Sequence, residues 1–165
     1  MIKASQVSFD ARGNPQPYGF IQLSLDSFHE TFVLSMNGSS ARTAIYDGFR
    51  RYSRALFSAI RADWFQWVDG SYTTKKPEPF DLDAVSVIRI DVVDANIASV
   101  RPLFMGSGDP LTTYKVHAFL VTECDPTDHR YAYCESRKAY WTNWFGRDRN
   151  KNPKGIVVLH ETGDA

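Results

Sequence analysis

The sequence predicts an α+β fold, a mixed sheet flanked by helices, in a single domain that spans residues 1–165. Stretches with helical and strand-like patterns follow one another without the regular strand–helix–strand alternation of a parallel α/β fold. Hydrophobic residues make up 43% of the chain and aromatic residues 14%, which suits a substantial core in a chain of this length. No internal repeat or low-complexity linker divides the sequence, so we expect one domain.

The N-terminal part is expected to form an extended arm and two helices. Residues 9–23 are rich in Gly, Pro and Asn, a composition typical of loops and extended arms. Residues 24–33 predict a short helix, for which Ser24 or Asp26 is the expected N-cap. Residues 41–64 predict a long helix, because apolar residues recur at steps of three and four along one face. This face consists of Ile45, Phe49, Tyr52, Leu56 and Ile60.

The remainder of the chain predicts four strands and two helices. Runs of aromatic and β-branched residues are typical of strands, and they occur at residues 64–68, 82–93, 112–123 and 154–161. Asp94 is placed to cap a short helix over residues 95–104. Residues 128–145 predict an aromatic-rich helix. These strands and helices together make up the mixed sheet and its flanking layers.

Charge and cysteine content exclude some classes of partner and site. Lys and Arg total 19, as do Asp and Glu, so no net charge draws the protein to nucleic acid or to a membrane. The opening residues lack the apolar segment of a signal peptide, and no apolar run approaches the ~20 residues that span a bilayer. We therefore expect a cytoplasmic protein without membrane contact. Cys124 and Cys134 lack the spacing of metal ligands and are expected to be unpaired thiols.

The stretch WVDGSYTTKKPEPFDLDAV, residues 67–85, ends on two aspartates at the start of a predicted strand. Asp81 and Asp83 are two residues apart, so a strand directs both side chains to one face. Either one of two converging carboxylates takes up a proton, or a divalent cation binds between them. Mg²⁺, or Mn²⁺ in its place, is the expected ion, because Mg²⁺ prefers oxygen ligands from carboxylates and phosphates.

A turn of small residues precedes the two aspartates. Gly70 and Ser71 lie at the end of the preceding strand, where glycine lets a ligand approach the backbone and serine adds a hydroxyl for phosphate oxygens. Lys75 can add positive charge, and Lys154 is either a phosphate contact or a turn residue. Such a set suits a metal–triphosphate, as nucleotidyl transfer requires. The alternative is a solvated surface turn without a ligand.

The turn and the aspartate pair together resemble the signature of the polymerase-β-like nucleotidyltransferase superfamily. More narrowly, three stretches are similar to a small family of minimal nucleotidyltransferase-like proteins of bacteria and mobile elements. They are FDARGNPQPYG (residues 9–19), VDGSYTTKKPEPFDLD (68–83) and YWTNWFGRDRNKNPKGI (140–156). The resemblance implies that Gly70 and Ser71 contact the nucleotide phosphates. It also implies that Asp81 and Asp83 are catalytic residues that hold Mg²⁺.

The resemblance further implies a third catalytic carboxylate on a neighbouring strand, and at that position the sequence has His117. A histidine could act as a catalytic base, but its nitrogen is a poor ligand for Mg²⁺. Glu123 is expected on the same strand face, yet it lies six residues along, roughly 20 Å at strand rise. Whether the protein is an active enzyme therefore stays open.

Two functions follow from the resemblance and a third from composition. The first is transfer of a nucleoside monophosphate from an NTP to a hydroxyl on protein or RNA, in a toxin–antitoxin or phage-defence setting. The second is a non-catalytic relative that keeps the fold and acts by binding a partner protein. The third is binding of RNA or DNA through the aromatic residues of 128–145 and an arginine stripe. The stripe consists of Arg50, Arg54 and Arg61.

Overall fold

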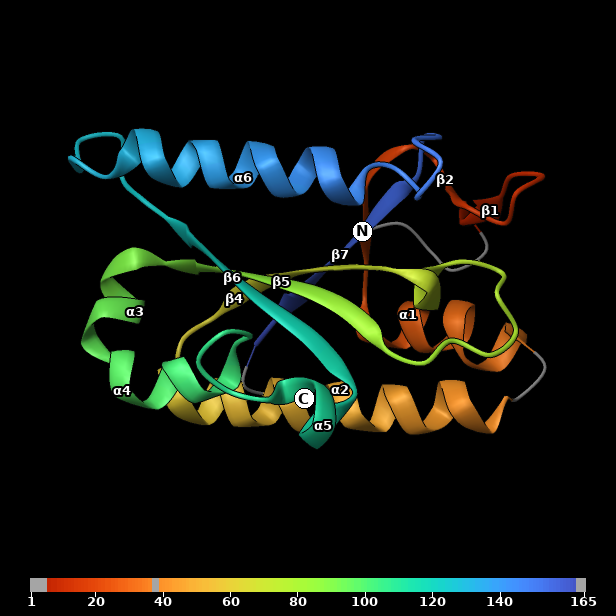
Figure 1. Ribbon diagram of the computed structural model, residues 1–165, viewed down its shortest axis with the longest axis horizontal. Coiled ribbons are helices and arrows are strands. Elements are labelled where there is room, and N and C mark those ends of the chain that lie inside the picture. Colours follow the sequence, from red (N-terminus) through yellow and green to blue (C-terminus); the bar gives the residue numbers. More distant parts are fainter. Residues whose placement is uncertain (1–5, 37–38, 163–165) are drawn as a thin grey trace.

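The computed structural model describes residues 6–36 and 39–162, and it confirms the predicted α+β class. Its centre is a mixed sheet with the strand order β3-β7-β4-β5-β6 (Figure 1). The strands are β3 (Gly19–Leu23), β4 (Trp64–Asp69), β5 (Leu82–Arg89), β6 (Val116–Glu123) and β7 (Gly155–Glu161). β3 pairs parallel with β7 and β5 parallel with β6, whereas β4 runs antiparallel to both of its neighbours. A small antiparallel pair lies outside this sheet, formed by β1 (Ser8–Phe9) and β2 (Pro15–Gln16).

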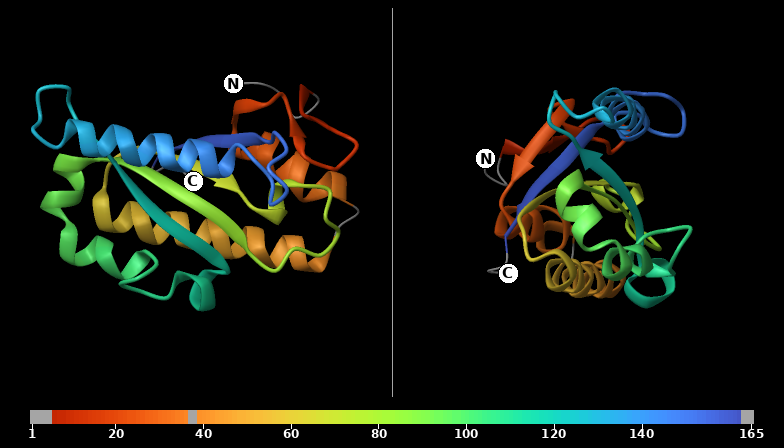
Figure 2. Two further views of the ribbon diagram at one scale, coloured as in Figure 1. Left: turned by 45° about the horizontal axis from the view of Figure 1, so that its top comes forward. Right: turned by 90° about the vertical axis from the view of Figure 1, so that its left-hand side faces the viewer.

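Helices cover both faces of the sheet, which is therefore the middle layer of the molecule (Figures 1 and 2). α1 (Leu25–Phe32) and α2 (Ser40–Ile60) lie against one face, and α6 (Tyr131–Phe145) lies against the other. The shorter helices are α3 (Ile90–Ala95), α4 (Ile97–Val100) and α5 (Pro110–Tyr114), and the 3-10 helices are η2 (Leu34–Met36), η3 (Ser71–Thr73) and η4 (Arg101–Leu103). Because both faces are buried, β4, β5 and β7 are largely apolar on both sides. Among the residues described, no helix has both the length and the apolar character needed to cross a membrane.

The long helix α2 forms where the sequence predicts it. The Ser39 side chain accepts a hydrogen bond from Arg42 N and caps the helix, and Arg61 ends it in the left-handed conformation. The apolar face predicted for this helix is buried against the sheet. Ser24 is the N-cap of α1, accepting a hydrogen bond from Ser27 N at 3.1 Å. Both helix starts are thus set by side chains that satisfy free backbone N–H groups.

Three predicted boundaries are corrected by the structure. Residues 19–23, predicted as part of the arm, form strand β3, because β7 offers them a parallel edge. The strand predicted over residues 82–93 ends at Arg89, after which α3 begins. The strand predicted over residues 112–123 begins only at Val116, because α5 precedes it and ends at Lys115, which has a φ of 59°. Pairing with distant strands and local helix ends decided these boundaries.

Two predictions about side chains are wrong. Asp94 does not cap a helix: it lies within α3, and its carboxylate is 2.7 Å from Arg130 Nη1. Cys124 and Cys134 are not unpaired thiols but form a disulfide. The chain turns back after β6 into α6, and this turn brings the two Cα atoms to 6.2 Å, within the range that a disulfide spans. Sequence spacing alone did not reveal the turn.

Candidate functional site

Asp69, Asp83 and His117 lie side by side on three neighbouring strands. The registers pair Asp69 of β4 with Asp83 of β5, and Asp83 with His117 of β6. Val85, two residues after Asp83, belongs to the core beneath α6, so the two-residue period of a strand places the row on that face. Asp81 precedes Asp83 by two residues and faces the same way. We call these four residues (Asp69, Asp81, Asp83 and His117) the Asp–His cluster.

The structure brings Asp81 and Asp83 together at one point. His117 Nδ1 lies 3.2 Å from Asp83 Oδ1 and 3.5 Å from Asp81 Oδ2. Burial raises the pKa of Asp83, the Asp81 carboxylate raises it further, and His117 lowers it. Partial burial and mutual repulsion both disfavour the charged forms of Asp81 and Asp83. A positive charge between the two carboxylates therefore stabilises them.

The turn after β4 depends on glycine. Gly70 has a φ of 77°, in the left-handed region where other side chains are strained. A Cβ atom at this position would overlap Asp83 Oδ2, so the turn is in direct contact with Asp83. Ser71 opens η3, and its hydroxyl makes no hydrogen bond to another residue within the described part of the chain. The turn thus presents a backbone and a hydroxyl beside two carboxylates.

Lys154 and Asp69 hold this turn from inside the protein. The Lys154 ammonium lies 2.7 Å from Asp69 Oδ1 and donates a hydrogen bond to Gly70 O at 2.6 Å. Lys154 is 4% exposed and Asp69 6% exposed, so both charges are withdrawn from water. Burial raises the pKa of Asp69 to about 6, although the nearby Lys154 lowers it. In this structure Lys154 supports the Gly70 turn.

The raised pKa of Asp69 predicts a pH-dependent stability. The folded protein binds the Asp69 proton more tightly than the unfolded chain, so the stability that this group contributes is present below its ordinary pKa of 3.8 and is lost as the pH rises through about 6. A rise of the Asp69 pKa from 3.8 to about 6 on folding corresponds to a change of about 3 kcal/mol in the free energy of unfolding. We expect the free energy of unfolding, from urea titrations at several pH values, to fall more steeply between these limits in the wild type than in Asp69→Asn. Equal slopes would contradict the assignment.

Arg42 organises the segment between Gly70 and Asp81. Its side chain is fully buried, and its guanidinium donates hydrogen bonds to four carbonyl oxygens. The acceptors are Phe32 O at 2.9 Å, Tyr72 O at 2.7 Å, Thr74 O at 2.7 Å and Lys76 O at 2.6 Å. The sequence analysis did not identify Arg42, although a signal was present. It stands three residues before Ile45, so the helical period places a charged residue on the apolar face of α2.

Arg42→Lys is expected to release this segment, because lysine donates from a single nitrogen and cannot reproduce the planar fork of the guanidinium. Trypsin should then cleave the native protein after Lys75 about tenfold faster, as local opening becomes easier, and mass spectrometry would identify the product. Arg54→Lys is the matched control, since Arg54 is exposed on the same helix and its side chain has no partner among the described residues. Unchanged cleavage in Arg42→Lys would mean that other contacts hold the segment.

Three stretches that lie far apart in the sequence, residues 9–19, 68–83 and 140–156, meet at this site. Asn14, in the first stretch, donates to Asp148 Oδ2 in the third at 3.1 Å. Lys75 N, in the second, donates to Gly13 O in the first at 3.0 Å. The Lys75 ammonium lies 5.5 Å from the centre of the Phe9 ring, so this side chain faces the N-terminal arm. Segments far apart in sequence therefore surround the Gly70 turn.

The Asp–His cluster suits a metal ion that brings further ligands with it. Among the described residues, no group of three or more His, Cys, Asp or Glu side chains has the arrangement of a metal site. Mg²⁺ commonly takes only one or two carboxylates from a protein and completes its octahedron with water and phosphate oxygens. Asp81 and Asp83 fit that role. His117 is the poorer ligand, because nitrogen suits softer metals.

Comparison with known protein families gives one match. A family model described as "Family of unknown function (DUF6932)" matches residues 7–160. The chain belongs to the DUF6932 family. The matched range contains the Asp–His cluster, the Gly70 turn and all three of the stretches that meet there. No curated protein and no solved structure matches the chain.

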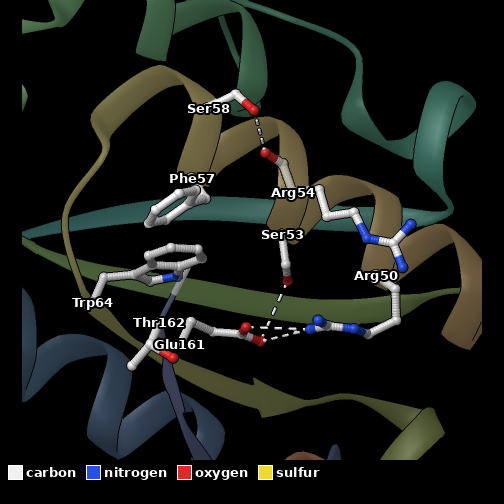
Figure 3. A pocket seen from close by; sticks show the side chains of 8 residues that line it. All are labelled: Arg50, Ser53, Arg54, Phe57, Ser58, Trp64, Glu161 and Thr162. Atoms are coloured by element: carbon white, nitrogen blue, oxygen red, sulfur yellow. Dashed lines mark hydrogen bonds and ion pairs between the residues drawn. The ribbon is translucent and has the colours of Figure 1, made fainter. Parts of the chain in front are cut away.

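The predicted arginine stripe of this DUF6932 protein is interrupted by burial. Arg50 Nη1 lies 3.2 Å from Glu161 Oε2, and both side chains are buried. Ser53 Oγ donates to the same carboxylate, and a cavity of about 280 Å³ adjoins the ion pair (Figure 3). Glu161 is the last residue of β7, at the opposite end of the sheet from the Asp–His cluster. Arg54 and Arg61 remain exposed, but Arg50 is neutralised within the fold.

Proposed function

We propose that this DUF6932 protein is a minimal nucleotidyltransferase that binds a nucleoside triphosphate with Mg²⁺ and transfers its nucleoside monophosphate to a hydroxyl on protein or RNA. The observation that supports this most is the meeting of Asp81 and Asp83 at one point beside the Gly70 turn. An acid pair next to a glycine turn suits a metal–polyphosphate, because the ion neutralises both the carboxylates and the phosphates.

The proposed binding roles follow the geometry of the site. Asp81 and Asp83 would hold Mg²⁺, which when bound neutralises charge on the triphosphate and orients it for in-line attack. The Gly70 backbone and the Ser71 hydroxyl would contact phosphate oxygens. Lys154 would keep the turn in place through its hydrogen bond to Gly70 O. It is a positioning residue in this scheme.

His117 stands where the resemblance expects a third carboxylate, and we assign it the role of general base. Nδ1 faces the Asp83 carboxylate, which leaves Nε2 to accept the proton of the acceptor hydroxyl. The hydroxyl oxygen then forms a bond to the α-phosphorus. The bond from that phosphorus to the bridging oxygen breaks, and pyrophosphate leaves. Asp83 Oδ1, which faces Nδ1, stabilises the imidazolium produced.

The setting of this activity is part of the proposal. NTPs, RNA and acceptor proteins all occur in the cytoplasm, so we propose that the protein acts there. A reducing compartment disfavours disulfides, and the Cys124–Cys134 bond would form there against that tendency. The resemblance to minimal nucleotidyltransferases suggests a toxin–antitoxin or phage-defence system.

Incubation with each labelled NTP, with Mg²⁺ or Mn²⁺, and with cellular RNA and protein tests the proposal. Label on either acceptor that requires the divalent ion supports it. His117→Ala should keep NTP binding, measured by isothermal titration calorimetry, and lose transfer, because Asp81 and Asp83 remain. A protein that neither binds an NTP nor transfers label would overturn the proposal.

A non-catalytic role is the second candidate, and the outer face of α6 favours it. Tyr133, Tyr140 and Trp144 are exposed there at helical spacing, and aromatic residues are enriched at protein interfaces. In this role the protein keeps the fold, binds nucleotide and acts by binding a partner protein. Tight NTP binding without transfer to any acceptor would select this second candidate.

A further inference from the structure

A second cavity lies at the free edge of the sheet. β6 is the last strand in the sheet order, and a cavity of about 290 Å³ lies along it. α6 borders this cavity on one side, and α4 with η4 borders it on the other. In the right-hand view of Figure 2, β6 lies at the margin of the sheet between α6 and the shorter helices. We call this space the β6-edge cavity.

The β6-edge cavity begins where the Asp–His cluster ends. Phe119 lines the cavity and follows His117 by two residues on the same face of β6. The centres of the two rings are 6.5 Å apart, a distance that the ribose of a nucleotide can bridge. A ligand held at the cluster by its phosphates can therefore place its other end in the cavity.

The wall towards α6 is a pair of packed rings. The ring centres of Phe119 and Trp141 are 4.4 Å apart. Trp141 is 7% exposed, yet its Nε1 has no hydrogen-bond partner among the described residues. Buried indole N–H groups usually find an acceptor. The Trp141 N–H is therefore an unsatisfied donor in this wall. Aromatic walls of this kind stack planar heterocycles such as nucleobases.

Two arginines border the cavity without an acidic partner. Within the described part of the chain, neither Arg101 nor Arg137 forms an ion pair. The Arg137 guanidinium lies instead 5.0 Å from the centre of the Tyr140 ring. Arginine only donates hydrogen bonds, so a ligand here must supply acceptors. Guanine presents two adjacent acceptors, O6 and N7, whereas adenine presents one acceptor beside a donor.

We propose that the β6-edge cavity receives the base of the bound nucleotide and selects guanine through Arg101 and Arg137. This inference rests on the proposed function, since the triphosphate at the Asp–His cluster anchors the ligand. Phe119 stacks on the base with Trp141 packed behind it, and the arginines donate to the acceptor edge of the base. The volume of about 290 Å³ is just below the usual range of small-molecule sites, which suits a group as small as a nucleoside.

Calorimetric titration with GTP, ATP and inorganic tripolyphosphate, each with Mg²⁺, separates recognition of the base from recognition of the phosphates. The wild type should bind GTP about tenfold more tightly than ATP, and tripolyphosphate most weakly. Arg137→Met keeps the aliphatic part of the side chain but removes the donors. It should abolish the preference for GTP without changing the affinity for tripolyphosphate. Arg51→Met, an exposed position on α2, is the control and should leave all three affinities unchanged.

The outcomes distinguish the base site from the proposed function. Equal affinities for GTP and ATP in the wild type would overturn the base site alone, as would a GTP preference that survives Arg137→Met. Binding of the nucleotides at the Asp–His cluster would still stand in both cases. If none of the three ligands binds, the proposed function fails, and the base site fails with it.

Discussion

Asp81→Ala is expected to reduce Mg²⁺-dependent nucleotidyl transfer by about a thousandfold, the size of loss that follows removal of one charge-stabilising group from an active site. In the wild type both Asp81 and Asp83 face His117, and the substitution leaves only Asp83 of this pair. A single carboxylate holds Mg²⁺ weakly, so the affinity for the metal–nucleotide should fall as well. The initial rate of label transfer from an α-labelled NTP, at saturating acceptor, measures the effect.

The fold should tolerate this substitution, because Asp81 precedes β5 and its side chain is partly exposed. Asp63→Ala is the matched control: Asp63 is an exposed aspartate at the start of β4, at the opposite end of that strand from the Asp–His cluster. Both variants should melt within about 2 °C of the wild type, as surface substitutions do. Full activity in Asp81→Ala would refute the two-carboxylate site and the transfer reaction proposed for it.

Lys154→Met is expected to destabilise the fold by about 3–5 kcal/mol, because it leaves the Asp69 carboxylate buried without its cation. The two charged groups are 2.7 Å apart and both are withdrawn from water. In a domain of this size the loss corresponds to a thermal midpoint about 10 °C lower. The loss should shrink in acid, because a protonated Asp69 needs no counter-ion.

The double variant Lys154→Met/Asp69→Asn separates the ion pair from the packing around it. With both charges removed, no unpaired carboxylate is buried, so much of the lost stability should return. Urea unfolding of the wild type, the two single variants and the double variant completes the cycle. If the double variant is no more stable than Lys154→Met, then Lys154 stabilises the fold through Gly70 O and not through Asp69.

Elements with a strong local period were predictable from the sequence. α2 follows from its apolar residues at helical spacing, and β4 and β7 follow from runs of aromatic and β-branched residues. β3 was not predicted as a strand, because its strand character depends on pairing with β7, at the other end of the chain. The late start of β6 was missed for a different reason, which is local. Residues 112–114 have strand-like composition, but the Asp109 cap places them in α5.

The candidate site was predictable only in part. Gly70 and the aspartate pair were identified from short-range spacing, but Asp69 was overlooked although it directly precedes Gly70 at the end of a predicted strand. Arg42 was overlooked although it lies on the apolar face of a predicted helix. Both residues act through partners that are distant in sequence, namely Lys154 and the carbonyl groups of the loop.

The sequence by itself determined the fold class, the long helices and the two-residue spacing that directs Asp81 and Asp83 to one face. These features depend on local periodicity, which each segment carries alone. Only the tertiary structure decided that His117 faces both carboxylates and that Lys154 is buried against Asp69. The physical reason is that the register between strands and the approach of a distant loop arise from packing the whole chain into one core, and no single segment encodes them.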